Sequence, residues 1–208
     1  MKSKIIPTVF ATNKRDFKEK FSKLSRVSDS LQIDFMDGKF VNNTSIGVSD
    51  IPRVKNYEAH LMVYNPGKWL DKLKKKNFKK IIFHYESFKT DRMIREFISK
   101  AKSFRFDVFI AINPETKVKD ILGFIKEVDG ILIMGVHPGR ERQKLIRKTY
   151  SKIKKIRKLN KEIPIQIDGG VNPKTASKLI NAGATILNSG SFISKAENPR
   201  RAIERLRV

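Results

Sequence analysis

One repeated unit constrains the fold of this chain more than any other feature: a short apolar segment, then a loop, then a segment with helical periodicity. Several of the apolar segments are nearly continuous, which is typical of strands buried on both faces of a parallel sheet. The predicted strands are Ile5–Phe10, Leu31–Phe35, Tyr57–Val63, Lys80–His84, Asp107–Ile112, Gly130–Val136, Ile163–Asp168 and Ala184–Asn188. Their alternation with helices predicts an α/β protein with a parallel sheet.

The segments between these strands carry helical spacing or helix-start signals, whereas Asn42–Pro52 is polar and is predicted to be a loop. The predicted helices are Lys14–Leu24, Pro66–Lys75, Asp91–Ser103, Lys117–Glu127, Lys144–Leu159, Lys174–Ala182 and a last one from about Asn198 to Leu206. Eight units in 208 residues match a single (β/α)8 TIM barrel domain over residues 1–208. An open doubly wound sheet is the alternative, but no GxGxxG follows the first strand.

The charge balance is strongly basic, with 45 Lys and Arg against 21 Asp and Glu and a net charge of +24. Such a field attracts polyanions and anionic small substrates. The lysines recur at helical spacing, as in residues 68–80 and 148–163, and no zinc finger, RNP-like strand or recognition helix is present. We therefore expect solvated helix faces and no specific nucleic-acid partner.

Cysteine usage and hydropathy limit which classes of protein this sequence can belong to. The chain has no cysteine, which excludes disulfides and thiolate metal sites. Its first residues faintly resemble a signal peptide, but the apolar part is short and contains Pro7, so a first strand explains it better. No apolar run approaches the roughly 20 residues of a membrane span. We expect a cytoplasmic protein without membrane contact.

Two predicted strands run out into acids and glycine: LQIDFMDG carries two acids, the first of them Asp34, and IPIQIDGG carries Asp168. In a barrel of this class the active site lies at the carboxyl ends of the strands. One carboxylate could remove a proton beside a carbonyl while the other returns one on the opposite face, which inverts a stereocentre. The pair could instead bind a cation or cap loops.

Two histidines fall in neighbouring strands. His60, within YEAHLMV, could be a core residue, or it could complete a metal triad with Asp34 and Asp168 for a d-block dication. His84 ends the fourth strand, where it could bind substrate or donate to a carbonyl.

Glycine-rich turns follow the seventh and eighth strands. Gly169, Gly170, Gly190 and Ser191 lie where this fold commonly holds a phosphate on backbone N–H groups, although simple turn chemistry explains glycines too.

Three methionines fall near strand ends. Met36, Met62 and Met134 could give a sugar a soft apolar surface or could pack the barrel, and their spacing does not separate the two.

These motifs together resemble the ribulose-phosphate 3-epimerase family over nearly the whole chain. The matching blocks are PTVFA, IDFMDGKFVNN, AHLMV, FHYE, INPET, ILIMGVHPG, IQIDGGVN and SGSFI. The resemblance implies a (β/α)8 barrel enzyme that interconverts ribulose 5-phosphate and xylulose 5-phosphate. It also implies a homo-oligomer.

The resemblance implies roles for individual residues. Asp34 and Asp168 match the family's acid and base, and together with His60 they match ligands of a catalytic metal, usually zinc, iron or manganese. The substrate-binding residues that it implies are Thr8 (in place of a serine), Met36, His60, Met62, Met134, Gly139, Gly169, Gly170, Gly190 and Ser191.

The chain departs from the family at Gln32, where the family has a fourth metal ligand, histidine. An amide oxygen is a weaker ligand than imidazole for zinc-like metals. The site could then bind metal weakly, prefer a harder ion such as manganese or magnesium, or work without metal, with the Gln32 amide and His60 donating to an enediolate.

A second departure follows Pro138-Gly139, where Arg140-Glu141-Arg142-Gln143 replaces the family's Phe-Gly-Gly-Gln. The arginines could clamp phosphate bidentately, or the loop could be an exposed charged turn that no longer closes; Glu141 slightly favours the second reading. Two functional alternatives follow: an epimerase of another ketose phosphate, or a non-catalytic phosphosugar-binding homologue.

Overall fold

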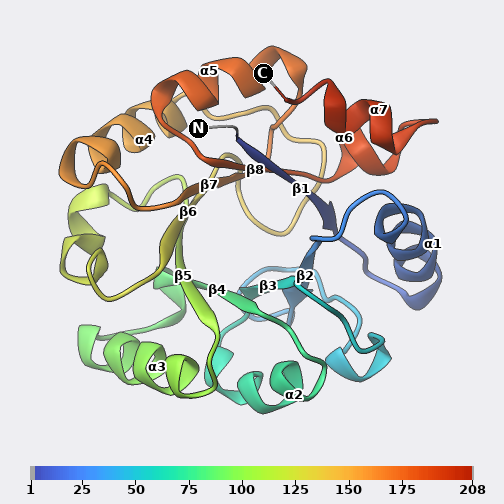
Figure 1. The fold of residues 1–208 in the computed structure, drawn as a ribbon. Coiled ribbons are helices and arrows are strands. Elements are labelled where there is room, and N and C mark those ends of the chain that lie inside the picture. Colours follow the sequence, from blue (N-terminus) through green and yellow to red (C-terminus); the bar gives the residue numbers. More distant parts are fainter. Residues whose placement is uncertain (1–2, 208) are drawn as a thin grey trace.

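A computed structural model, in which residues 3–207 are described, shows eight parallel strands closed into a barrel. The strands are β1 (Lys4–Val9), β2 (Gln32–Met36), β3 (Glu58–Met62), β4 (Lys80–His84), β5 (Asp107–Ile112), β6 (Gly130–Met134), β7 (Ile165–Asp168) and β8 (Ile186–Ser189). Each pairs with the next along the chain, and β8 returns to pair with β1. Figure 1 shows the barrel from one end, with the helices as an outer ring. The predicted (β/α)8 TIM barrel is therefore confirmed.

The outer ring contains α-helices and short 3₁₀ helices. The α-helices are α1 (Lys14–Ser25), α2 (Leu70–Lys75), α3 (Asp91–Ser103), α4 (Lys148–Leu159), α5 (Pro173–Ala182), α6 (Ser191–Ser194) and α7 (Pro199–Glu204). The 3₁₀ helices are η1 (Val48–Asp50), η2 (Pro66–Lys68), η3 (Tyr85–Ser87) and η4 (Val118–Phe124).

The sequence prediction was wrong in parts of this ring. The α-helix expected over Lys117–Glu127 is the 3₁₀ helix η4, which contains Gly123, a residue that weakens helices. Helix α4 begins four residues later than predicted, because the preceding residues pack against the barrel: the Ile146 N–H donates to the Gly135 carbonyl at 2.8 Å.

Strand β2 shows why the sequence positions a site here. Ile33 and Phe35 point to the helical layer, where the Phe35 ring lies 5.4 Å from Trp69 and 5.9 Å from Phe78. The alternate residues Gln32 and Asp34 point into the barrel, because successive strand side chains face opposite sides. The polar members of an otherwise apolar strand are therefore held inside the barrel.

The barrel interior is divided into two halves of different chemistry. The half next to β5 and β6 is apolar and is packed, together with Ile82 of β4, by Phe109, Ala111, Leu132, Met134 and Val136. The half next to β2, β3, β7 and β8 holds buried polar and charged side chains, and Lys80 and His84 of β4 reach into it. The polar half is where a reactive site can be built.

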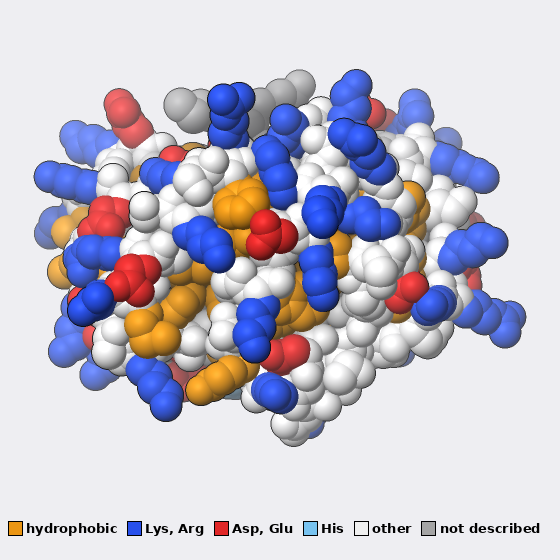
Figure 2. Space-filling model, turned by 90° about the horizontal axis from the view of Figure 1, so that it is seen from below, with side chains coloured by type: hydrophobic (Ala, Val, Ile, Leu, Met, Phe, Trp, Pro, Cys, Tyr) orange, Lys and Arg blue, Asp and Glu red, His pale blue; other side chains and the backbone are white. Residues whose placement is uncertain are grey.

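Basic side chains are spread over the outer surface. On the face in Figure 2, lysines and arginines are scattered, with acidic and apolar patches between them. This distribution fits solvated helix faces. Within residues 3–207, none of the helices is long and apolar enough to cross a bilayer.

Helix α3 offers a test of local stability. Thr90 caps it by accepting a hydrogen bond from the Met93 N–H at 3.3 Å. Thr90→Ala is expected to lower the free energy of unfolding by about 1 kcal/mol, measured by urea denaturation, because a helix-end donor loses its acceptor. Thr90→Ser keeps the hydroxyl and should unfold near the wild-type midpoint; equal losses in both variants would contradict the capping role.

Candidate active site

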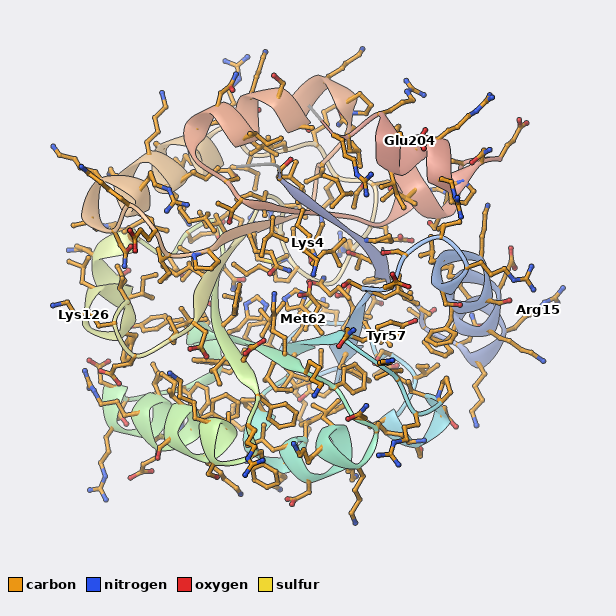
Figure 3. All side chains as sticks on the ribbon, in the orientation of Figure 1. Lys4, Arg15, Tyr57, Met62, Lys126 and Glu204 are labelled. Atoms are coloured by element: carbon orange, nitrogen blue, oxygen red, sulfur yellow. The ribbon has the colours of Figure 1, made fainter. Side chains whose placement is uncertain are left out.

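A cavity of about 390 Å³ opens at the carboxyl ends of the strands. Met62, near the barrel axis in Figure 3, contributes to its wall, whereas Arg15 and Lys126 project from the outer ring. The sequence-predicted residues that line this cavity are Thr8, Asp34, His60, Met62, Met134, Gly139, Asp168, Gly169, Gly170, Gly190 and Ser191. Met36 and Gln32 do not line it: both are buried in β2.

Asp34, His60 and Asp168 meet at the floor of the cavity. In the strand register Asp34 on β2 lies beside His60 on β3, and Asp168 ends β7. The His60 Nδ1 atom lies 3.1 Å from Asp34 Oδ1 and 3.3 Å from Asp168 Oδ2. The fold thus brings together two carboxylates and an imidazole from positions far apart in the sequence.

Burial and mutual contact shift the proton affinities of this cluster. Burial raises the pKa of Asp34 to about 6, against the opposing hydrogen bond from His60. Burial disfavours charge on His60, but hydrogen bonds to Asp168 and Asp34 outweigh it and raise the pKa of His60 to about 9. A carboxyl that titrates near neutral pH is well suited to exchange protons with a substrate.

The same three residues could hold a metal ion. One oxygen of each carboxylate and one nitrogen of His60 all lie within 4.8 Å of one another. Carboxylate and imidazole donors together suit zinc, iron or manganese in the divalent state. The donor set therefore fits the divalent metal that the sequence resemblance implies.

His84 is not a cavity residue, so it does not fit the substrate-binding interpretation. It is fully buried, and its Nε2 lies 2.9 Å from Nε2 of His60. Its Nδ1 lies 3.3 Å from Glu86 Oε2. Burial lowers the pKa of His84. This contact holds the far side of the His60 ring and turns Nδ1 toward the two carboxylates.

One end of the cavity is formed by the turns after β7 and β8 and by basic side chains. Gly169 and Gly170 have φ values of +95° and +69°, and Gly190 and Ser191 lie beside them. Arg140, Arg142 and Lys195 also line the cavity. Backbone N–H groups and cations together suit an anionic group.

Gly170 is expected to tolerate no side chain. A Cβ there would lie 2.7 Å from both the N and Cα atoms of Leu145, and the positive φ adds strain. We expect Gly170→Ala to raise the KM for a phosphorylated ketose about tenfold, measured by steady-state kinetics. In the control Gly67→Ala, the new Cβ would meet only Asn65 Oδ1 at 3.5 Å, so KM should not change.

The loop with the arginines, residues 138–143, packs over the cavity. Asn43 donates to the Gly139 carbonyl at 2.6 Å, and Gln143 donates to the His137 carbonyl at 2.6 Å. Glu141 pairs with Lys20 at 3.4 Å. These contacts support a loop that covers the site more than the open charged turn favoured from the sequence.

Sequence reasoning missed several polar residues beneath the cluster. They are Glu58, Lys80, Gln166 and Asn188, which are joined by hydrogen bonds and ion pairs in the polar half of the barrel. A signal was present: Glu58 and Gln166 lie two positions before His60 and Asp168, and therefore on the same strand face.

Comparison with known proteins agrees with this geometry. The model of the "Ribulose-phosphate 3 epimerase family" matches residues 4–194. Ribulose-phosphate 3-epimerase of Schizosaccharomyces pombe is 30% identical and covers 100% of this chain and 93% of its own. Its Bacillus subtilis counterpart is 31% identical over 86% of each chain. The solved structure of KGPDC from Streptococcus mutans has a TM-score of 0.73 at 10% identity, covering 99% of this chain and 96% of its own, and supports the fold alone. The chain belongs to the ribulose-phosphate 3-epimerase family.

Proposed function

We propose that the protein interconverts D-ribulose 5-phosphate and D-xylulose 5-phosphate by moving a proton at C3. The observation that carries this proposal is the convergence of Asp34 and Asp168 from β2 and β7 on one cavity. Two carboxylates from different strands that meet at one cavity can serve the two faces of one carbon, as inversion of its configuration requires.

In the proposed reaction, one aspartate takes the C3 proton and leaves an enediolate. The other aspartate delivers a proton to the opposite face of C3, and which acts as base depends on the direction. Covered on one side by the loop 138–143, the site limits the access of water to the intermediate. His60, between the carboxylates, keeps both oriented toward the cavity.

Asp34, His60 and Asp168 would hold the divalent metal, and Gln32 is the fourth candidate carried over from the family. A bound dication supplies stabilisation of negative charge that develops on substrate oxygens. The identity of the ion, zinc, iron or manganese, is part of the proposal.

We propose that the phosphate lies at the glycine-lined end of the cavity. Gly169, Gly170, Gly190 and Ser191 would approach it through their backbones, and Thr8, Met62 and Met134 line the path toward the aspartates. Met36, which lies outside the lining, would act through packing in β2.

The deciding experiment is proton exchange in heavy water. The protein is incubated with ribulose 5-phosphate in D₂O, and NMR follows the C3 proton and the appearance of xylulose 5-phosphate. The proposal expects deuterium at C3 of the product. Exchange with other ketose phosphates only would indicate the alternative substrate class, and binding without any exchange would indicate a non-catalytic phosphosugar-binding protein.

The remaining sequence predictions concern the molecule as a whole. We propose that the chain functions as one domain, forms a homo-oligomer and works in the cytoplasm. Light scattering coupled to size-exclusion chromatography tests the oligomer, since a monomeric mass would contradict it.

A further inference from the structure

We propose that Gln32 is locked as a hydrogen-bond donor to Asp34 and Asp168 by a chain of buried polar groups, and that it is therefore not a metal ligand. This inference rests on the proposed function of the two aspartates. It assigns a role to the buried polar residues beneath the aspartates, of which Glu58, Lys80 and Gln166 do not line the cavity and Asn188 does.

The series of buried polar groups begins with two side chains whose hydrogen-bonding roles are fixed. The ammonium of Lys80 only donates, and the carboxylate of Glu58 only accepts. Lys80 Nζ lies 2.8 Å from Glu58 Oε2 and 3.9 Å from the centre of the Phe109 ring. Glu58 is 3% exposed, so its second oxygen must find donors inside the barrel.

Two amides supply those donors. Gln166 Nε2 donates to Glu58 Oε1 at 2.6 Å, and Asn188 Nδ2 donates to the same oxygen at 3.1 Å. Lys80 Nζ also donates to Gln166 Oε1, at 3.3 Å. The charges at Lys80 and Glu58 therefore dictate which end of each amide carries the NH₂ group.

The orientation of these amides decides that of Gln32. Their NH₂ groups also face Gln32, so the atom of Gln32 that meets them must be an acceptor. Gln32 Oε1 accepts from Asn188 Nδ2 at 2.7 Å and from Gln166 Nε2 at 3.4 Å. The NH₂ group of Gln32 is left to point upward into the cluster.

The contacts of Gln32 with the two aspartates agree with this orientation of its amide. Gln32 Nε2 donates to Asp34 Oδ1 at 2.9 Å and to Asp168 Oδ2 at 2.5 Å. Turning the amide over would place its oxygen against two carboxylates and its NH₂ group against two other NH₂ groups. Because Gln32 is fully buried, water could not relieve either conflict.

Two consequences follow for the site. An amide whose NH₂ group faces the carboxylates has no oxygen available for a metal, so the cluster among residues 3–207 offers three ligands, Asp34, His60 and Asp168. In addition, the two donated hydrogen bonds tie Asp34 to Asp168 and fix their separation. Gln32 is thus a positioning residue for the proposed acid and base.

The first test is titration of the metal-free protein with Co²⁺, followed by visible absorption. Because Gln32 positions two of the ligands, Gln32→Ala is expected to weaken Co²⁺ binding about 10–100-fold but to leave the absorption bands of bound Co²⁺ unchanged, since no ligand is lost. Gln32→His, which adds an imidazole, should change those bands. A change of the Co²⁺ bands in Gln32→Ala would mean that a ligand has been removed and would overturn the proposal. Gln143→Ala, a glutamine in the loop over the cavity, serves as the matched control and should leave the Kd unchanged.

A second readout needs neither metal nor turnover. The side-chain ¹⁵N–¹H₂ resonance of Gln32, identified by its loss in Gln32→Ala, should shift in Asp168→Asn because its acceptor changes. Asn188→Leu removes the hydrogen bond that Asn188 donates to Gln32 Oε1 and should speed hydrogen exchange of the Gln32 side-chain amide about tenfold or more. A resonance that responds to neither change overturns the proposal even if the protein epimerises ribulose 5-phosphate. Conversely, if the expected shifts are seen but no deuterium enters C3, the proposed orientation of the Gln32 amide is supported and the proposed reaction is contradicted.

Discussion

Asp168→Asn is expected to lower kcat for epimerisation of ribulose 5-phosphate by about 10²–10⁴-fold, measured in a coupled assay for xylulose 5-phosphate. The amide can neither accept nor deliver the C3 proton, while its shape and acceptor oxygen preserve the contact with Gln32. The folded structure should therefore persist, as circular dichroism can verify. Asp107→Asn, an exposed aspartate at the start of β5, is the matched control and should keep full activity.

Deuterium exchange separates the roles of the two aspartates. In Asp168→Asn, the remaining Asp34 should still exchange the C3 proton of one of the two pentulose phosphates but not of the other. Asp34→Asn should show the opposite preference. Equal exchange from both sugars in either variant would mean that a single group handles both faces, which contradicts the two-aspartate mechanism.

Lys80→Met is expected to lower the free energy of unfolding by about 3–5 kcal/mol, the range for a buried ion pair that loses one partner. The variant leaves Glu58, at 4% side-chain exposure, without its cation in the polar half of the barrel. It also removes the cation above the Phe109 ring. Urea denaturation followed by circular dichroism measures the loss.

The double variant Lys80→Met/Glu58→Gln tests the cause. If the unpaired carboxylate is responsible, neutralising it should recover more than half of the lost stability. A double variant no more stable than Lys80→Met alone would trace the loss to packing of the lysine stem instead. Arg92→Met breaks a pair whose arginine is 88% exposed and should leave the urea midpoint unchanged.

The strands were predictable because their signal is local. The alternation in β2 separates Ile33 and Phe35 from Gln32 and Asp34 without reference to any other part of the chain, and β4 and β5 were predicted with the bounds that they have. Eight such units also predict closure. The η4 segment was harder, because its seven residues are too few for periodicity to distinguish 3₁₀ from α geometry.

The candidate site was predictable only in its outline. The positions of Asp34 and Asp168 on inward faces of parallel strands indicate that they can meet, and the structure brings them together. The direction of the Gln32 amide could not be derived, because it depends on Gln166 and Asn188, which lie more than 130 positions away in the sequence. The sequence left open whether Gln32 binds a metal or donates a hydrogen bond, and the donors beneath it favour the second interpretation.

The division of the barrel interior into two halves has a consequence for how this protein can change. Around Ile82 and Leu132 the requirement is volume, so hydrophobic exchanges of similar size should be accepted one at a time. Around Glu58 and Gln166 each donor faces a specific acceptor, so a single replacement leaves a buried polar group without a hydrogen-bond partner. Randomised libraries of the two halves should accordingly yield functional variants by single steps in the first and only by compensating pairs in the second.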